Sequence, residues 1–190
     1  MDESYFEDQT FDKIDFSENE ITNGEYERCA FVDCNFSNGD LSEIKFSECE
    51  FKKCNLSMAK VVGTAFREVG FKDCKLLGLC FENCSEFLLA VNFENCIINF
   101  ASFHKLSLKN TGFKDCRLRE VDFGECNLSG SVFDNCDLMK ATFEHTILEK
   151  ADFRTAYNYS IDPDSNRIKK AKFSIPGIVG LLDKYEIEIK

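Results

Sequence analysis

Large apolar residues recur at every fifth position along most of this chain. From Phe93 to Phe153, each fifth residue is Phe, Leu or Ile without exception. This period matches neither the roughly 3.6 residues of an α-helical turn nor the two-residue alternation of a β-strand. The backbone must therefore turn a corner about every five residues to keep these side chains together. The pattern predicts a solenoid with short, straight edges.

A second period of twenty residues sorts the series into columns of like residues. Two such columns are Phe93, Phe113, Phe133 and Phe153, and Phe103, Phe123 and Phe143. If four five-residue edges complete one coil, the members of a column lie above one another at about 4.8 Å, the spacing of neighbouring strands. We therefore expect one elongated unit with a square cross-section and a narrow core built from these columns.

Residues 6–81 follow the same five-residue pattern in a different register. From Phe81 the next member would be Glu86, yet the series resumes at Leu88. Two extra residues near 85–88 therefore shift the register, which indicates either a small bulge or a hinge between two halves of one solenoid. This stretch contains no Gly or Pro, which favours the bulge.

Small residues occupy the position two before each central apolar residue, and ten of the eleven cysteines fall there. A position selected for small volume explains these ten as buried, small apolar residues, with Cys80 alone outside the pattern. The expected columns are Cys96, Cys116 and Cys136, and Cys34, Cys54 and Cys74. Neighbours in a column could approach disulfide distance, but the odd number of cysteines and the expected cytosolic setting favour free thiols.

The spacing of the cysteines argues against a metal centre. The chain has no Cys-x-x-Cys pair, and Cys29 and Cys34 would lie on adjacent faces of the solenoid rather than around one point. Structural zinc sites need their ligands to converge. We therefore expect no metal site and no cofactor.

The residue between the small position and the central one is often Asn or Asp, whose short side chains bond nearby backbone and support turns. Triplets of this kind are Cys34-Asn35-Phe36, Cys126-Asn127-Leu128, Cys136-Asp137-Leu138 and Ala151-Asp152-Phe153. They resemble the small-(Asp or Asn)-(Leu or Phe) core of the pentapeptide-repeat family, over about residues 4–156. The resemblance implies an all-β fold, a right-handed quadrilateral parallel β-helix.

The pattern fails at Asn158, and Asp162-Pro163 indicates a turn. Beyond it, Ser174 can cap a short α-helix, and alternating apolar residues from Tyr185 onward predict a strand. The expected organisation is a β-helix over residues 1–157 and a capping segment over 158–190.

This C-terminal arrangement resembles that of the Qnr-like and mycobacterial DNA-mimic branches of the family, in which two subunits pair end to end. The resemblance implies a homodimer through Ile175, Ile178, Val179, Leu181, Leu182, Ile187 and Ile189. The alternative is a monomeric cap, because an open coil end exposes unpaired strand edges and the apolar core, which the segment would cover by folding back.

The formal net charge of -11 is unevenly placed. Residues 1–50 hold 15 acidic residues against three basic ones, whereas the remaining 140 residues hold 19 acidic and 20 basic ones. Electrostatic repulsion argues against binding to nucleic acid or to anionic membranes and favours basic partners. The sequence shows no apolar run long enough to cross a membrane and no targeting segment, so we expect a cytoplasmic protein.

Eight acidic residues near the N-terminus are candidates for binding a basic partner: Glu7, Asp8, Asp12, Asp15, Glu18, Glu20, Glu25 and Glu27. The resemblance to gyrase-binding members implies that outward carboxylates on a rod of duplex-like width imitate the phosphates of DNA. In the alternative, acids at the open end stop solenoids from stacking edge to edge and keep the protein soluble. The near-neutral composition beyond residue 50 weakens the first hypothesis, because a DNA mimic should be negative along its length.

Enzymatic activity is not expected. His104 and His145 lie just after a central Phe and should face solvent, and a packed column offers no pocket in which catalytic groups could converge. The chain has no phosphate-binding loop, nucleophile elbow or dinucleotide fingerprint. We expect a non-catalytic structural or protein-interaction module whose partner the sequence does not identify. The alternative is binding to DNA gyrase or topoisomerase, with quinolone resistance or protection as the result.

Overall fold

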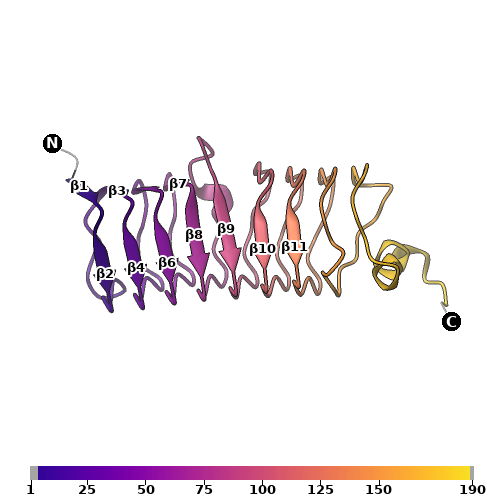
Figure 1. The fold of residues 1–190 in the computed structure, drawn as a ribbon, viewed down its shortest axis with the longest axis horizontal. Helices are drawn as coiled ribbons and strands as arrows, with labels where there is room; N and C mark the ends of the chain where they lie inside the picture. The colour runs from indigo at the N-terminus through magenta and orange to yellow at the C-terminus, as the bar shows by residue number, and fades with distance from the viewer. Residues whose placement is uncertain (1–3, 189–190) are drawn as a thin grey trace.

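The computed structural model describes residues 4–188, which form an elongated column of short parallel strands with the two chain ends at opposite ends of the column (Figure 1). The strands are β1 (Ser4–Glu7), β2 (Thr10–Asp12), β3 (Gly24–Glu27), β4 (Ala30–Val32), β5 (Lys45–Ser47), β6 (Glu50–Lys52), β7 (Ala65–Arg67), β8 (Val69–Lys72), β9 (Val91–Glu94), β10 (Gly112–Lys114) and β11 (Val132–Asp134). The helices are η1 (Phe81–Asn83), η2 (Pro176–Leu181) and η3 (Asp183–Tyr185), all of the 3-10 type.

The strands stack into two parallel sheets that run along the column. One sheet has the order β1-β3-β5-β7, and the other has the order β11-β10-β9-β8-β6-β4-β2. Neighbouring strands pair residues twenty apart, as Phe31 pairs with Phe51 in β4 and β6. Isolated bridges such as Asn35 to Asn55 continue the ladder on the other faces. The parallel β-solenoid expected from the twenty-residue period is therefore confirmed.

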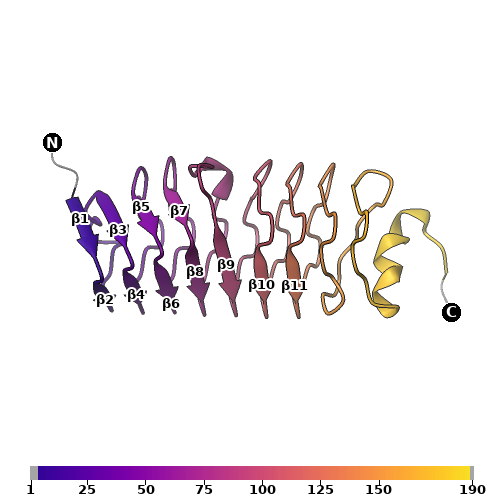
Figure 2. The same ribbon diagram turned by 45° about the horizontal axis from the view of Figure 1, so that its top comes forward.

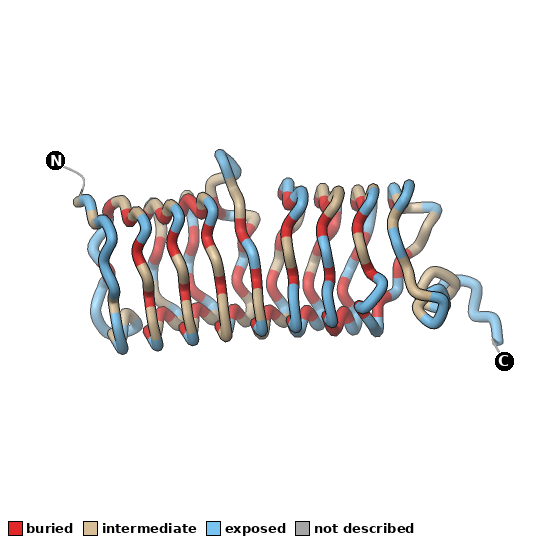
Figure 3. The backbone as a smooth tube through the Cα atoms, viewed as in Figure 1, coloured by how far each residue is buried: buried red, intermediate tan, exposed pale blue. Residues whose placement is uncertain are grey.

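The core contains an unbroken column of nine stacked rings: Phe11, Phe31, Phe51, Phe71, Phe93, Phe113, Phe133, Phe153 and Phe173. Successive centroids are 4.7–5.4 Å apart and the ring planes lie within 17° of parallel. The rings of the Phe103 column meet this column edge to face, as at Phe103 and Phe113. Both arrangements are favourable for the aromatic quadrupole. Buried residues accordingly recur along the coils from Ile21 onward, whereas the described part of the first coil has none (Figure 3).

The corners of the coils depend on Asn and Asp side chains and on left-handed backbone. Asp122 Oδ1 accepts a hydrogen bond from the Gly124 N–H at 2.8 Å, and Asn127 Oδ1 accepts one from Ser129 N–H at 3.1 Å. The predicted turn-supporting role of these residues is confirmed. Residues two after a central Phe, such as Asp33, adopt a positive φ. Asn and Asp tolerate this conformation better than most other residues.

The small residues before the corners also form hydrogen bonds. Many of them donate a hydrogen bond to the carbonyl of the central residue one coil earlier. The Cys54 thiol lies 3.3 Å from Phe31 O, and the hydroxyls of Thr64 and Ser131 lie 2.7 Å from the equivalent carbonyls. Size alone, which was the expected reason for this position, therefore does not explain it fully: a hydrogen-bond donor here also satisfies a buried carbonyl.

The register shift is a bulge, but its detail differs from the sequence prediction. Phe71 pairs with Phe93, so this coil has two more residues than the others. Leu88, where the apolar series was expected to resume, is exposed and adopts a φ of 60°. Leu89 packs against the core instead. With two extra residues in the coil, the chain bends outward at its middle, and the bulge projects from one side of the column (Figure 3).

The coil ladder continues beyond residue 157. Asp152 bridges to Lys172, and Phe173 stacks on Phe153 at 5.4 Å. Asn158 is exposed, as the failure of the pattern there predicts, while Tyr159 is buried against Phe153 and Phe173. The five-residue pattern is therefore lost before the solenoid ends.

The last segment packs across the end of the column as two short helices (Figure 2). The predicted α-helix is wrong in type, because η2 is closed mainly by i to i+3 bonds, such as Leu182 N–H to Val179 O at 2.9 Å. Ser174 Oγ accepts a hydrogen bond from Gly177 N–H, as its predicted capping role requires. The predicted strand is absent among residues 185–188, since Tyr185 ends η3 and Glu186 is left-handed. Ile189 lies outside the described residues.

Candidate protein-interaction surfaces

The eight candidate carboxylates form a collar around the N-terminal tip of the column. Going along the chain, they lie on one face after another: Glu7 and Asp8, then Asp12, then Asp15 and Glu18, then Glu20, and on the second coil Glu25 and Glu27. Four successive edges of a coil face four different directions. The acids therefore surround the tip and do not form a line along the column.

Arg28 neutralises part of this collar. Its guanidinium contacts Glu7 and Glu27 and lies 2.9 Å from Asp8 Oδ1. Tyr5 Oη donates a hydrogen bond of 2.6 Å to Glu27. This bond raises the pKa of Tyr5 to about 12 and lowers that of Glu27. Three of the eight candidate acids are thus engaged by one cation of the same chain, which the sequence analysis did not foresee.

The other carboxylates of the collar differ in how freely they can bind a partner. Asp15 accepts hydrogen bonds from Ser17 and Asn35, which lower its pKa, with the Ser17 hydroxyl the largest cause. Within residues 4–188, Glu18, Glu20 and Glu25 form no ion pair. These three carboxylates are the ones most available to an external cation.

The middle of the column has mixed charge. On the face of the longer sheet, Glu94 lies between Lys72 at 3.1 Å and Lys114 at 3.5 Å, so charges of opposite sign alternate from coil to coil. On the next face, Arg119 pairs with the buried carboxylate of Asp137 at 2.6 Å. Unlike the N-terminal tip, these coils do not present a one-sided negative surface.

The C-terminal end presents apolar side chains to solvent. Of the predicted interface residues, Ile175 is 87% exposed, and Ile178, Val179 and Ile187 are also exposed. Leu181 differs, because it packs against the core of the column and is only partly accessible. This end therefore combines a cap, in which Leu181 takes part, with outer apolar side chains that remain exposed among residues 4–188.

A cavity of about 520 Å³ lies between the last coil and η2. Tyr157 and Val179 line it, together with Tyr159, whose hydroxyl is buried without a hydrogen-bond partner in the described part of the chain. Gly180 approaches the Tyr159 carbonyl so closely that a Cβ would lie 2.2 Å from it. This cavity could not be predicted from the sequence, because it depends on how η2 folds back on the column.

The two candidate histidines lie in different environments. His104 lies 3.7 Å from Asp122 and 3.6 Å from Glu125 and is partly accessible, while His145 is exposed. Among residues 4–188, no group of three or more His, Cys, Asp or Glu side chains converges as metal ligands do. The helices described are all too short to cross a membrane.

Family models match both halves of the solenoid. The model described as a pentapeptide repeat region matches residues 79–157, and the model for eight copies of the pentapeptide repeat matches residues 29–67. This chain belongs to the pentapeptide-repeat family. No curated protein matches the sequence at a significant level.

Two solved structures of QnrB1 share the fold at low sequence identity. Full-length QnrB1, a plasmid-mediated fluoroquinolone resistance protein, is 17% identical with a TM-score of 0.50, over 97% of this chain and 100% of that one. A trypsin-treated variant of QnrB1 is 19% identical with a TM-score of 0.54, over 98% and 92%. HetL from the cyanobacterium Nostoc, involved in heterocyst differentiation regulation, is 19% identical with a TM-score of 0.39, over 88% and 86%.

Proposed function

We propose that this pentapeptide-repeat protein is a non-catalytic interaction module that pairs with a second copy of itself through its C-terminal end. The proposal rests on the exposed apolar side chains at that end, which are those of Ile175, Ile178, Val179 and Ile187. Exposed apolar side chains gathered at one end of a molecule commonly mark a protein interface. A second copy is the occupant that suits it best, because a two-fold interface brings identical apolar patches together.

Light scattering coupled to size-exclusion chromatography tests the pairing. We expect a dimer for the wild-type protein and a monomer for the double variant Ile175→Asp/Ile178→Asp, because both side chains would place a charge in the interface. Phe87→Asp is the matched control, since Phe87 is an exposed apolar residue on the central bulge, far from this end. A monomeric wild-type protein at tens of micromolar, or a dimer that survives the double substitution, would contradict the proposal.

A second candidate function is inhibition or protection of DNA gyrase by imitation of DNA. It is supported by the acidic collar at the N-terminal tip, and the structural likeness to QnrB1 makes gyrase the partner to test. The distribution of charge favours the general interaction module, because the carboxylates ring the tip while the middle coils are mixed.

A supercoiling assay with purified bacterial gyrase, with and without a quinolone, separates the two functions. Imitation of DNA requires an effect of the wild-type protein that weakens with salt, because it depends on charge. The triple variant Glu18→Lys/Glu20→Lys/Glu25→Lys should abolish the effect, whereas Glu120→Lys, an exposed carboxylate of the middle coils, should preserve it. No effect of folded wild-type protein at tens of micromolar eliminates gyrase as the partner.

A further inference from the structure

The cavity of about 520 Å³ between the last coil and η2 contains a polar group that the chain leaves without a partner. This group is the hydroxyl of Tyr159, a residue that is only 4% exposed. Within residues 4–188, four side-chain N or O atoms are buried without a hydrogen-bond partner, and Tyr159 Oη alone belongs to a buried residue. A buried hydroxyl that forms no hydrogen bond costs free energy, so its presence calls for a physical reason.

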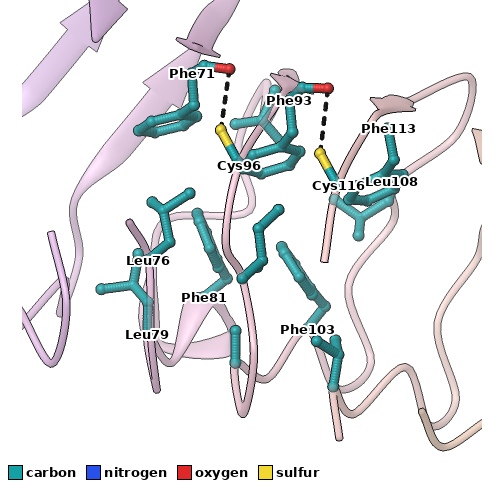
Figure 4. Close-up of a cluster of buried hydrophobic side chains, with 14 of the residues drawn as sticks. Phe71, Leu76, Leu79, Phe81, Phe93, Cys96, Phe103, Leu108, Phe113 and Cys116 are labelled. Atoms are coloured by element: carbon teal, nitrogen blue, oxygen red, sulfur yellow. Dashed lines mark hydrogen bonds between the residues drawn. The ribbon is translucent and has the colours of Figure 1, made fainter. Parts of the chain in front are cut away.

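Comparable buried donors are satisfied by the chain itself. The free thiol of Cys96 donates to the Phe71 carbonyl one coil earlier, at 3.4 Å (Figure 4). Tyr26 is also a buried tyrosine, and its hydroxyl donates to the Thr22 carbonyl at 2.7 Å. The unpaired hydroxyl of Tyr159 is therefore not a general consequence of placing a tyrosine in this core.

Helix η2 packs on Tyr159 through two glycines. A Cβ at Gly177 would lie 2.2 Å from Tyr159 Oη, and a Cβ at Gly180 would lie 2.2 Å from the Tyr159 carbonyl oxygen. The Gly177 N–H is already bonded to Ser174 Oγ at 3.1 Å. Because the residue beside the hydroxyl has no side chain, a partner for Tyr159 Oη has to come from the cavity that both residues line.

Two other polar side chains that line the cavity are engaged within the chain. Thr155 Oγ1 donates to Asp134 at 2.8 Å. Asn158 Nδ2 donates to Asp137, also at 2.8 Å. A buried water needs about two to four polar partners, so a water at the Tyr159 hydroxyl would find few free groups nearby.

The charge around the cavity favours an uncharged ligand. Among the described residues that line it, Arg154 is the only cation, and its guanidinium binds the Asp152 carboxylate at 2.7 Å. Asp183 adds an exposed carboxylate to the lining. The lining therefore offers no free cation to balance the charge of an anionic ligand.

The apolar part of the lining suits a flat aromatic group. Tyr157 on the last coil and Val179 on η2 both line the cavity, and each is 46% exposed. An aromatic ligand can stack on the tyrosine ring and bury apolar surface against the valine. The volume of about 520 Å³ lies within the range of about 300–1,000 Å³ that is usual for pockets of drug-sized ligands.

We propose that this cavity binds an uncharged, mainly aromatic molecule whose carbonyl or ether oxygen accepts a hydrogen bond from Tyr159 Oη. The aromatic part of the ligand lies between Tyr157 and Val179. The hydroxyl stays protonated for this role, because burial raises the pKa of Tyr159. The site is separate from the proposed pairing surface, since Ile175 and Ile178 are not among the described residues that line it.

Fluorescence titration with prodan, an uncharged naphthalene ketone, tests the proposal. Prodan has about 17 non-hydrogen atoms, for which the efficiency of drug-sized ligands predicts a Kd of about 0.1 mM. The full chain is added to a fixed, low concentration of prodan, whose emission moves to shorter wavelength as the probe leaves water. We expect saturable binding with this Kd or a lower one.

Tyr159→Phe removes the hydrogen bond and keeps the shape of the cavity. It should weaken prodan binding about threefold to tenfold, the effect of one hydrogen bond. The bound probe should emit at still shorter wavelength, because its carbonyl loses a donor. The free variant should unfold at the same temperature as the wild type or at a higher one, since an unpaired buried hydroxyl is gone.

Two further variants separate the site from its surroundings. Tyr185→Phe is the matched control, because Tyr185 is 54% exposed and is not among the described lining residues, so prodan binding should not change. Tyr157→Ala removes the stacking surface without opening the core, and should weaken binding about threefold to tenfold.

Four results would overturn the proposal. Two concern prodan directly: no saturable binding at protein concentrations several times the expected Kd, or equal Kd values for Tyr159→Phe and the wild type. The third is a lower unfolding temperature of free Tyr159→Phe, which would show that the hydroxyl is already paired. The fourth is loss of binding in Ile175→Asp/Ile178→Asp, which would place the probe on the pairing surface. Light scattering measures the pairing separately, so failure of one proposal is distinguishable from failure of the other.

Discussion

Truncation of Phe113 to alanine is the most direct test of the aromatic core. Phe113 is fully buried and is the sixth of the nine rings in the long column. Its ring stacks on Phe93 at 5.2 Å and on Phe133 at 4.9 Å, and it meets Phe103 and Phe123 edge to face. Phe113→Ala removes all four ring contacts at once.

We expect Phe113→Ala to lower the free energy of unfolding by about 4–5 kcal/mol, the upper part of the usual 3–5 kcal/mol range for buried Phe to Ala. The cost depends on how far the surroundings can collapse into the cavity. Here collapse is restricted, because hydrogen bonds between β9, β10 and β11 fix the coils above and below the cavity at the strand spacing. The rings of Phe93 and Phe133 therefore cannot close the gap between them.

Chemical denaturation followed by circular dichroism measures this loss, with the denaturant slope recorded because solenoids can unfold in parts. Phe173→Ala is the matched control at the end of the column, where one ring is stacked and the side chain is only partly buried. We expect Phe173→Ala to lower the free energy of unfolding by about 1–2 kcal/mol, since Phe173 buries less apolar surface on folding than Phe113 does. A loss below about 1 kcal/mol for Phe113→Ala, or equal losses for the two variants, would refute the idea that interior stacking stabilises the fold.

Three further predictions concern single sites. Asp137→Asn should cost about 1–3 kcal/mol, because the buried carboxylate bonds Arg119. Burial alone would raise the pKa of Asp137, but hydrogen bonds from Asn158 and Arg119 lower it overall. The contribution of this carboxylate to stability is therefore present above the ordinary carboxyl range and is lost as pH falls through the folded pKa, so the difference in free energy of unfolding between wild type and variant should shrink there. Gly24→Ala should destabilise the protein by about 1–3 kcal/mol, measured by thermal unfolding, because its Cβ would lie 2.2 Å from the Ser4 carbonyl. Arg28→Gln should leave the denaturation midpoint close to that of the wild type at physiological salt, because its ion pairs are exposed and screened, and a clear drop in the midpoint there would contradict that reasoning.

The candidate interaction surfaces could be located from the sequence, but the arrangement and pairing of their charged side chains could not be predicted from it. The sequence placed the acidic residues near one end. Whether they form a line or a collar depends on the direction in which each edge of the coil faces. Arg28 shows the same limit: its acidic partners Glu7 and Asp8 are about one coil away in sequence and become neighbours only through stacking of β1 on β3.

The sequence by itself determined the repeating unit of this protein, because the five-residue period is local chemistry. Each five-residue edge needs a large residue inside, a small one before the corner and a turn-forming residue between them, and these choices are visible residue by residue. Asp122 and Asn127 were assigned correct roles for this reason.

Only the tertiary structure decided what happens where that pattern is interrupted. At the bulge, the sequence offered Leu88 as the next core residue, and the structure buries part of Leu89 and exposes Leu88. At the C-terminal end, Phe173 lies outside the five-residue series yet completes the stack on Phe153. In both places several residues have side chains that could fill the core. Backbone pairing with the neighbouring coil decides which of them does. The same pairing places Cys74 beside Cys96 and so joins the two expected columns of cysteines into one.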